Sequence, residues 1–194
     1  MTLNTYNYKF IEKKWHQYWN KNNFFNPKTN KKKKSYTILM PPPNITGVLH
    51  MGHVLNNTIQ DILIRKKRMK NYETCWIPGI DHASIATETK IIKILKNASI
   101  NKNKISKRNF LKYIWKYKNK YGNIILNQLK KIGISCDWSK KKFTMDNVLS
   151  KTVIKSFIKL YQNKYIYRGE KIINWDTKNQ TVISEDEVIY KKKK

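Results

Sequence analysis

The sequence has 194 residues and a formal net charge of +29, because 41 Lys and Arg residues outnumber 12 Asp and Glu residues. Hydrophobic residues make up 40% of the chain, which is enough for a buried core and excludes wholesale disorder. A long apolar run and a secretory signal are both missing from the sequence, so no membrane partner is predicted. Two cysteines, Cys75 and Cys136, are too few for a disulfide framework. We therefore expect a cytoplasmic protein.

The positive charge has two explanations that composition leaves open. The chain contains 37 Lys, 26 Ile and 22 Asn residues, and these three amino acids share A/T-rich codons, so genomic base bias can produce the excess. A field of this strength would still attract RNA, with an affinity that falls steeply with salt. The run Lys31–Lys34 is expected to be part of a solvated loop rather than an RNA contact.

The apolar pattern predicts alternating helices and strands along the chain. Helices are expected over 9–20, 52–70, 85–96, 107–131 and 146–162, and strands over 36–40, 74–77 and 171–175. The order strand, helix, strand, helix at the start predicts a parallel α/β unit, with the helix-rich 100–165 region beside it.

Several side chains are assigned to the core or the surface by their position in these elements. One side of the 52–70 helix is marked by apolar residues, namely Leu55, Ile59, Ile62, Leu63 and Met69. Trp15, Trp19 and Trp76 are expected in the core, and His16 on the surface. Gly122 is the one weak point of the 107–131 helix.

One stretch joins the end of the first predicted strand to the start of the next helix. It reads Pro-Pro-Pro-Asn-Ile-Thr-Gly-Val-Leu-His-Met-Gly-His and covers residues 41–53. Ligands of open α/β sheets bind at this edge, and a helix N-terminus there favours a phosphate. Gly52 lets a flat ring or a phosphate approach the backbone. His50 and His53 can donate hydrogen bonds to phosphate oxygens that gain charge in a transition state.

The same residues also have simpler interpretations. Two histidines at this spacing can be surface residues or metal ligands, although no third ligand lies nearby in the sequence, which makes a metal the lesser option. Asp81 precedes the apolar periodic stretch of the 85–96 helix, and Asp is a favoured helix N-cap.

Four blocks, in order, carry a resemblance to a known family. The His50–His53 turn resembles the HIGH signature of the class I aminoacyl-tRNA synthetases, and its surroundings resemble the valine-specific branch. The supporting blocks are Pro41–Gly47, Pro78–Thr87, Asp137–Ser139 with Phe143–Asp146, and Asn174–Asp176 with Ile183, Ser184, Glu187 and Val188. The resemblance covers nearly the whole chain.

The resemblance implies a ligase that activates valine with ATP and then passes valine to tRNA(Val). Valine attacks the α-phosphate, which gives valyl-adenylate and pyrophosphate, so the enzyme must position the reactants and stabilise phosphate charge. By similarity, His50 and His53 are catalytic and bind the ATP phosphates, while Gly52 lies against adenine. Mg²⁺ would accompany ATP.

The resemblance also implies an amino-acid site. Asp81 would take the valine ammonium, an assignment that its charge also favours, and Pro42 and Asn44 would form part of the pocket wall. Some relatives carry a zinc-binding Cys-x-x-Cys pair where this chain has Asp176 and Asn179, so no zinc is predicted.

The fold class implied is α/β, the first half of a Rossmann-type class I synthetase nucleotide-binding domain with added helices. Residues 1–35 would form an N-terminal helix and a Lys-rich loop, residues 36–175 the first half of the catalytic domain, and residues 176–194 the start of a connection to an editing domain. The family's remaining domains are not in this sequence. We therefore expect a truncated or split gene product that is inactive by itself, with the missing portion as a second chain.

Two alternative functions compete with this assignment. A small adenylyl- or cytidylyltransferase also uses His-x-Gly-His at a strand-to-helix turn, but such enzymes lack the other blocks. A non-catalytic, basic RNA-binding module or split-enzyme subunit derived from a synthetase is the second alternative, which the charge of +29 permits.

Overall fold

The computed structural model describes residues 6–178 and 180–192. The chain forms two compact units that divide between Ser150 and Lys151. The division into segments 1–35, 36–175 and 176–194, expected from the resemblance, remains a prediction. Asn179, one of the two positions compared with a zinc pair, lies outside the described residues.

Parallel strand pairs form the centre of the first unit. Strand β1 (Ser35–Leu39) pairs with β2 (Glu73–Ile77) in parallel, in register from Ser35–Glu73 to Leu39–Ile77. After Pro78 the same segment continues as β3 (Gly79–Ile80), which pairs in parallel with β4 (Lys142–Phe143). The predicted parallel α/β unit is therefore confirmed. The continuous segment from β2 to β3 lies between strands β1 and β4.

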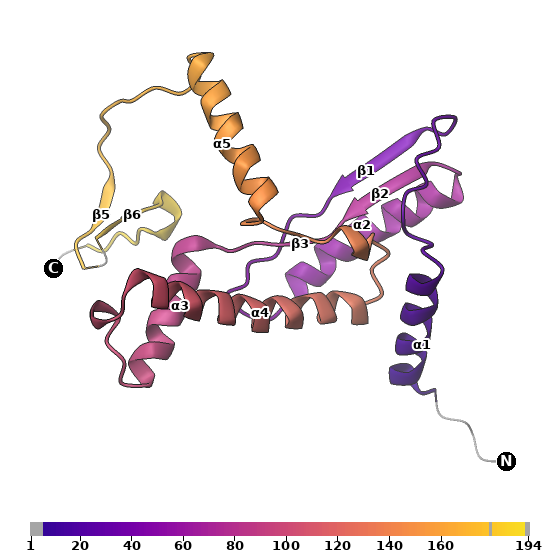
Figure 1. Cartoon of the computed structure of the whole chain (residues 1–194), viewed down its shortest axis with the longest axis horizontal. Coiled ribbons are helices and arrows are strands. Elements are labelled where there is room, and N and C mark those ends of the chain that lie inside the picture. The colour runs from indigo at the N-terminus through magenta and orange to yellow at the C-terminus, as the bar shows by residue number, and fades with distance from the viewer. Residues whose placement is uncertain (1–5, 179, 193–194) are drawn as a thin grey trace. The chain divides into compact units, whose positions relative to one another are not determined.

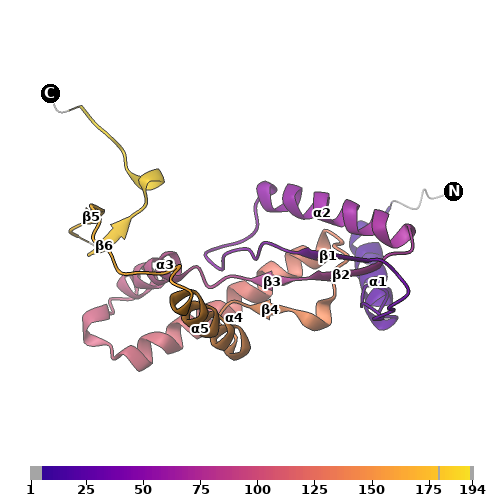
Figure 2. The same cartoon turned by 90° about the horizontal axis from the view of Figure 1, so that it is seen from above.

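Helices flank these strands. They are α1 (Tyr8–Lys21), α2 (Met51–Met69), α3 (Ser84–Asn97) and α4 (Lys107–Lys131), all close to their predicted ranges. In Figure 1, α2 connects β1 to β2, as expected of a parallel crossover. Figure 2 shows α2 and α4 on opposite sides of the strands.

Two apolar clusters hold the first unit together. The larger one joins the strands to α2 and α4, and its buried members are Met40, Ile45, Ile64, Trp76, Ile80, Ile125, Leu129, Ile134, Cys136 and Phe143. The smaller one joins α3 to α4 through Ile91, Leu95, Phe110 and Tyr117. Burying these side chains removes apolar surface from water, which is the main stabilising term for such a unit. Trp76 is fully buried, as predicted.

The apolar side of helix α2 is exposed. The side chains that mark it are 42–81% exposed, namely Leu55, Ile59, Ile62, Leu63 and Met69. The helix instead contacts β2 through polar groups, because Trp76 Nε1–H donates to Gln60 Oε1 (3.1 Å) and Arg68 Nε–H donates to Thr74 Oγ1 (3.0 Å). Ile64 is its one buried apolar side chain. The helix forms as predicted, but the apolar side that its period marks is not the side that contacts the strands.

Predictions for α1 and the loop after it have mixed outcomes. Trp15 is 45% exposed and Trp19 half-buried, so neither is the core residue that was predicted. His16 is half-buried against Trp138 rather than on the open surface, and this burial together with the positive charge of Lys130 lowers its pKa. Residues 31–34 are exposed, as predicted for a solvated loop.

The second unit is small. It holds most of α5 (Asn147–Gln162) and an antiparallel pair formed by β5 (Asn174–Asp176) and β6 (Thr181–Ile183). The strand predicted over 171–175 begins only at Asn174, because pairing starts where Ile183 of β6 lies opposite. No helix in the described parts of the chain is both long enough and apolar enough to cross a bilayer.

Candidate active site

The strand ends bring the predicted amino-acid-binding residues together. The Ile45 N–H donates to the Asp81 carbonyl (3.0 Å), and the Asp81 N–H donates to the Pro43 carbonyl (2.8 Å), so the two segments pair as a parallel bridge between Asn44 and Asp81. Pro42 and Asn44 are both exposed beside this bridge. The structure therefore places Pro42, Asn44 and Asp81 at one edge of the strands.

His50 and His53 build the N-terminus of α2. His50 is the N-cap residue, and its Nδ1 accepts a hydrogen bond from the Gly52 N–H (3.1 Å). The His50 N–H in turn donates to His53 Nδ1 (3.3 Å), and the two ring centroids lie 3.9 Å apart. The pair thus satisfies free N–H groups of the helix in the reciprocal manner of a capping box.

This capping arrangement fixes where each ring carries its proton. An Nδ1 atom that accepts a hydrogen bond has no proton, so the neutral imidazole carries it on Nε2. Partial burial and, second, the neighbouring His50 lower the pKa of His53, which favours its neutral form. His50 and His53 can therefore each offer a neutral Nε2–H donor to a phosphate oxygen.

Gly52 makes room for the His50 ring. A Cβ at position 52 would lie 3.0 Å from His50 Cε1 and 3.1 Å from His50 Nδ1, closer than ordinary contacts. Gly47, earlier in the same loop, has nothing within 4 Å of its ideal Cβ position. The His50 ring can therefore occupy its observed position because residue 52 has no side chain.

Helix α4 holds the loop that leads to His50. The Leu49 N–H donates to Gln128 Oε1 (3.0 Å), and the Tyr117 hydroxyl donates to the Thr46 carbonyl (3.3 Å). Sequence reasoning missed both contacts. The signal available was that Tyr117 on the apolar side of a long helix, and the polar Gln128 beside it, need hydrogen-bond partners when they face a neighbouring segment.

Asp81 closes a turn and is not the N-cap of α3. The N-cap is Ala83, whose φ of 50° places it in the left-handed region. Asp81 Oδ1 accepts from the Ala83 N–H (3.3 Å) and from the Thr144 hydroxyl (3.0 Å). Its side chain is 31% exposed, and among the described residues no donor reaches Oδ2. The N-cap alternative is therefore wrong, and one carboxylate oxygen is open to a ligand.

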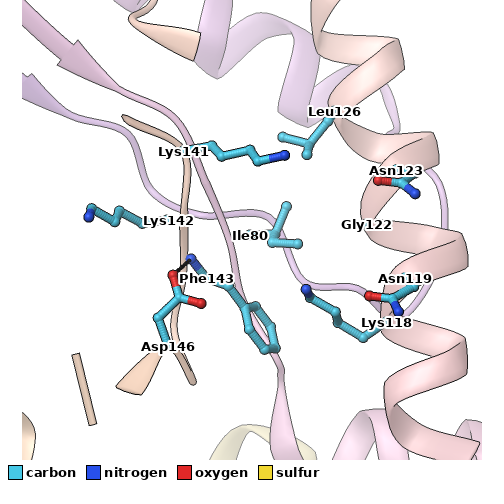
Figure 3. A pocket seen from close by; sticks show the side chains of 10 residues that line it. All are labelled: Ile80, Lys118, Asn119, Gly122, Asn123, Leu126, Lys141, Lys142, Phe143 and Asp146. Carbon is cyan, nitrogen blue, oxygen red and sulfur yellow. Dashed lines mark hydrogen bonds between the residues drawn. The ribbon is translucent and has the colours of Figure 1, made fainter. Parts of the chain in front are cut away.

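The Phe143–Asp146 block supplies structure around this turn. Asp146 Oδ2 accepts from the Phe143 N–H (2.9 Å), as Figure 3 shows, while the Asp146 N–H donates to the Phe143 carbonyl (2.8 Å). Thr144 is held between them and contacts both Asp81 and His82. Sequence reasoning singled out this block without giving Thr144 a role.

A small cavity of about 120 Å³ lies behind the site, between α4 and the β3–β4 pair. Figure 3 shows Ile80 pointing toward α4, between Gly122 and Leu126. Lys118 lies over the Phe143 ring, with Nζ 4.7 Å from the ring centroid. Ile80 and Phe143 thus pack on the core side, while the residues that follow them, Asp81 and Thr144, form the turn.

The described residues contain no clustered metal ligands. Across residues 6–178 and 180–192, no three His, Cys, Asp or Glu side chains converge as a metal site. Cys75 and Cys136 are both free thiols, and burial raises the pKa of Cys136. His50 and His53 act as capping residues in this structure. The predicted absence of zinc stays a prediction.

Comparisons with known proteins agree on one family. The profile of "tRNA synthetases class I (I, L, M and V)" matches residues 14–194. The valine–tRNA ligases of Christiangramia forsetii and Parabacteroides distasonis are 50% and 52% identical over 97% and 96% of this chain. The chain spans about a fifth, 21%, of the length of these relatives.

A solved structure shares the fold. A LeuRS from Agrobacterium radiobacter K84, in a ternary complex named LeuRS-tRNA-LeuAMS, matches with a TM-score of 0.75 and 22% identity. The match covers 95% of this chain and 22% of that one. At this level of identity the likeness supports the Rossmann-type class I arrangement and not a shared substrate.

Proposed function

Because this chain belongs to the class I tRNA synthetases of the I, L, M and V group, we propose that it provides the first half of the active site of a valine–tRNA ligase. The complete enzyme would join valine to tRNA(Val) at the expense of ATP. Since the relatives are about five times as long, we assign the activity to the complete enzyme in which these residues lie, whether in one polypeptide or two.

The bridge between Asn44 and Asp81 is the observation that carries this proposal. It joins the backbone of Asn44, in the proposed pocket wall, to the backbone of Asp81. The Asp81 carboxylate is partly exposed, and no donor among the described residues reaches its Oδ2. A carboxylate in this position suits an ammonium group, because a charge-assisted hydrogen bond is shorter and stronger than a neutral one. In the proposed enzyme, Asp81 binds the valine ammonium while Pro42 and Asn44 line its side.

His50 and His53 serve the adenylation step. The valine carboxylate attacks the α-phosphorus of ATP, the bond to the bridging oxygen breaks, and pyrophosphate leaves. Negative charge builds on the phosphate oxygens in the transition state, where preorganised donors contribute most. The Nε2–H groups of the two capped rings, together with the positive N-terminal end of α2, provide such donors. We also assign Gly52 to the adenine side of the site, on the resemblance to the family.

Other components of the reaction come from outside the described residues. The carboxylates at this edge do not form a cluster that would hold Mg²⁺, so we assign Mg²⁺ to the triphosphate of ATP. The tRNA would arrive after adenylation, when a ribose hydroxyl attacks the valyl carbonyl and AMP leaves. We place the enzyme in the cytoplasm, where translation supplies its tRNA.

ATP–pyrophosphate exchange tests the proposal. We expect the complete enzyme to exchange label with valine and far less with leucine or methionine, and to charge tRNA(Val). Residues 1–194 alone should give no exchange, because ligands at such a site come from both halves of the sheet. Equal exchange with all three amino acids would overturn the valine assignment. Salt-sensitive binding of unrelated RNA, with no exchange by the complete enzyme, would favour the RNA-binding alternative.

A further inference from the structure

We propose that Thr144 is the positioning residue for Asp81, and that its hydroxyl also holds His82 in the Nδ1–H tautomer. The inference concerns the orientation of two side chains in the turn after β3. It rests on the proposed function only in naming the substrate ammonium as the group that Asp81 receives.

Three contacts converge on the Thr144 hydroxyl. It lies 3.0 Å from Asp81 Oδ1, 3.0 Å from the His82 backbone nitrogen and 2.6 Å from His82 Nδ1. The His82 N–H can only donate, so the Thr144 oxygen accepts there. Two contacts remain, but the hydroxyl has a single proton to give.

The charge of Asp81 decides where that proton goes. An ionised carboxylate only accepts hydrogen bonds, so a Thr144 oxygen 3.0 Å from Asp81 Oδ1 without a proton between them would be repelled. The Thr144 hydroxyl therefore donates to Asp81. The remaining contact, to His82 Nδ1, then requires that the ring carries its proton on Nδ1 and donates to Thr144.

The same proton also faces Asp81. His82 Nδ1 lies 3.3 Å from Asp81 Oδ1, so an Nδ1–H group supports the carboxylate that Thr144 contacts. His82 thus has the tautomer opposite to that of His50 and His53, whose Nδ1 atoms accept. Its Nε2 is left as an acceptor, and the ring borders a cavity of about 180 Å³ that Trp115 and Phe143 also line.

The backbone keeps Thr144 in place for this task. The Thr144 N–H donates to the Ile80 carbonyl (3.2 Å), which extends the β3–β4 pairing by one residue. The turn closed by Asp146 and Phe143 follows immediately. Thr144 is thereby fixed to the strand that ends at Ile80, directly before Asp81. It orients Asp81 so that Oδ1 is occupied and Oδ2 is open to the substrate.

The test combines three variants. Thr144→Val removes the hydroxyl while keeping the shape, and Thr144→Ser keeps the hydroxyl. Thr87→Val is the matched control, because the buried hydroxyl of Thr87 on α3 donates to the His82 carbonyl (2.6 Å) and not to the side chain of Asp81 or His82. All three are made in the 194-residue chain and in the complete enzyme.

The first readout is the ring tautomer of His82 in the 194-residue chain, from ¹⁵N and ¹³C shifts at a pH of about 8.5, where an ordinary imidazole is neutral. Wild type and Thr144→Ser should show Nδ1–H, while Thr144→Val should shift the tautomer ratio toward Nε2–H by roughly fivefold or more, as expected for one lost hydrogen bond. Thr87→Val should leave the ratio unchanged. An Nε2–H ring in wild type, or a ratio that ignores Thr144→Val, would overturn the proposal.

The second readout is pyrophosphate exchange by the complete enzyme. Thr144→Val should raise the KM for valine roughly fivefold and leave the KM for ATP unchanged, and Thr144→Ser should restore valine binding. If Asp81→Asn raises the valine KM but Thr144→Val does not, Thr144 does not position Asp81. If Asp81→Asn itself has no effect, the assigned role of Asp81 fails, and the tautomer alone then decides whether Thr144 orders the turn.

Discussion

Gly122 of α4 faces the side chain of Ile80 at the end of β3. A Cβ at position 122 would lie 2.8 Å from Ile80 Cδ1, a separation that real Cβ atoms do not adopt. The glycine that weakens the helix in the sequence therefore lets α4 approach the strand that leads to Asp81. An added methyl group therefore requires Ile80 Cδ1, the far end of a flexible side chain, to move within the cavity that both residues line.

Overpacking usually costs about 1–3 kcal/mol, and the better helix propensity of alanine returns about 1 kcal/mol. We therefore predict that Gly122→Ala destabilises the chain by about 1 kcal/mol net. Urea unfolding followed by circular dichroism measures the difference. The double variant Gly122→Ala/Ile80→Val, which also removes Cδ1, should recover part of the loss. A single variant as stable as wild type would show that the contact relaxes freely.

Gly52→Ala should impair function without impairing stability. The new Cβ would press on the His50 ring and displace it from its cap, whereas alanine suits a helix better than glycine. We expect the exchange rate of the complete enzyme to fall by about tenfold or more, as for a mispositioned donor, with an unchanged unfolding midpoint. Gly47→Ala, where a Cβ meets nothing within 4 Å, is the control. Equal rates for both variants would contradict this role.

Asp81→Asn should weaken valine binding far more than ATP binding. The substitution keeps the size of the side chain but removes the charge that faces the ammonium, a contact of about 1.5–3 kcal/mol or roughly 10- to 100-fold in KM. Exchange assays with valine and ATP varied in turn separate the two effects. Glu12→Gln, which neutralises an exposed carboxylate on α1, should change neither value. A valine KM within twofold of wild type would refute the assignment.

His53→Ala should lower the rate of adenylation more than it weakens the binding of valine. The contact to phosphate strengthens as charge develops, so the loss should appear in kcat, by about 100-fold if the ring acts as a donor to the transition state. Rapid-quench measurement of valyl-adenylate formation checks this. An unchanged rate with a raised KM for valine would instead place His53 in the amino-acid site.

The titration of His53 has a predictable sign. Its pKa is lowered by burial and, second, by His50. The unfolded chain therefore binds more protons than the folded chain as the pH falls below the ordinary histidine value of about 6.5, and stability falls with the pH across this window. NMR titration of the ring should give a midpoint below that value, and His50→Ala should raise it only in part. A midpoint at or above the ordinary value would contradict the capped geometry.

Periodic patterns predicted the elements because each element buries one consistent face. On α4, Phe110, Ile125 and Leu129 follow the 3.6-residue period and are all buried. On α2 the period marks an apolar side that is exposed, while Gln60 and Arg68 contact β2 through hydrogen bonds, which hydrophobicity does not register. Hydrophobic periodicity predicts that a helix forms, whereas the side of the helix that faces the strands depends on the residues opposite it.

The candidate site was predictable as a set of residues but not as a geometry. Its position at a strand-to-helix turn followed from the prolines and from the helix after His50. The bridge between Asn44 and Asp81 and the contacts of Thr144 join segments that are 37 and 63 residues apart. Such pairings depend on tertiary packing, and a single sequence carries no local signal for them.

The bridge between Asn44 and Asp81 has a consequence for how selective such a pocket can be. Neighbouring strands are held about 4.8 Å apart by their backbone hydrogen bonds, so the two walls cannot separate or close without breaking the pairing at Pro43 and Ile45. The floor of the proposed amino-acid pocket therefore has a fixed width. Amino acids of different size must be distinguished by the side chains that project from these two segments and by the residues opposite them.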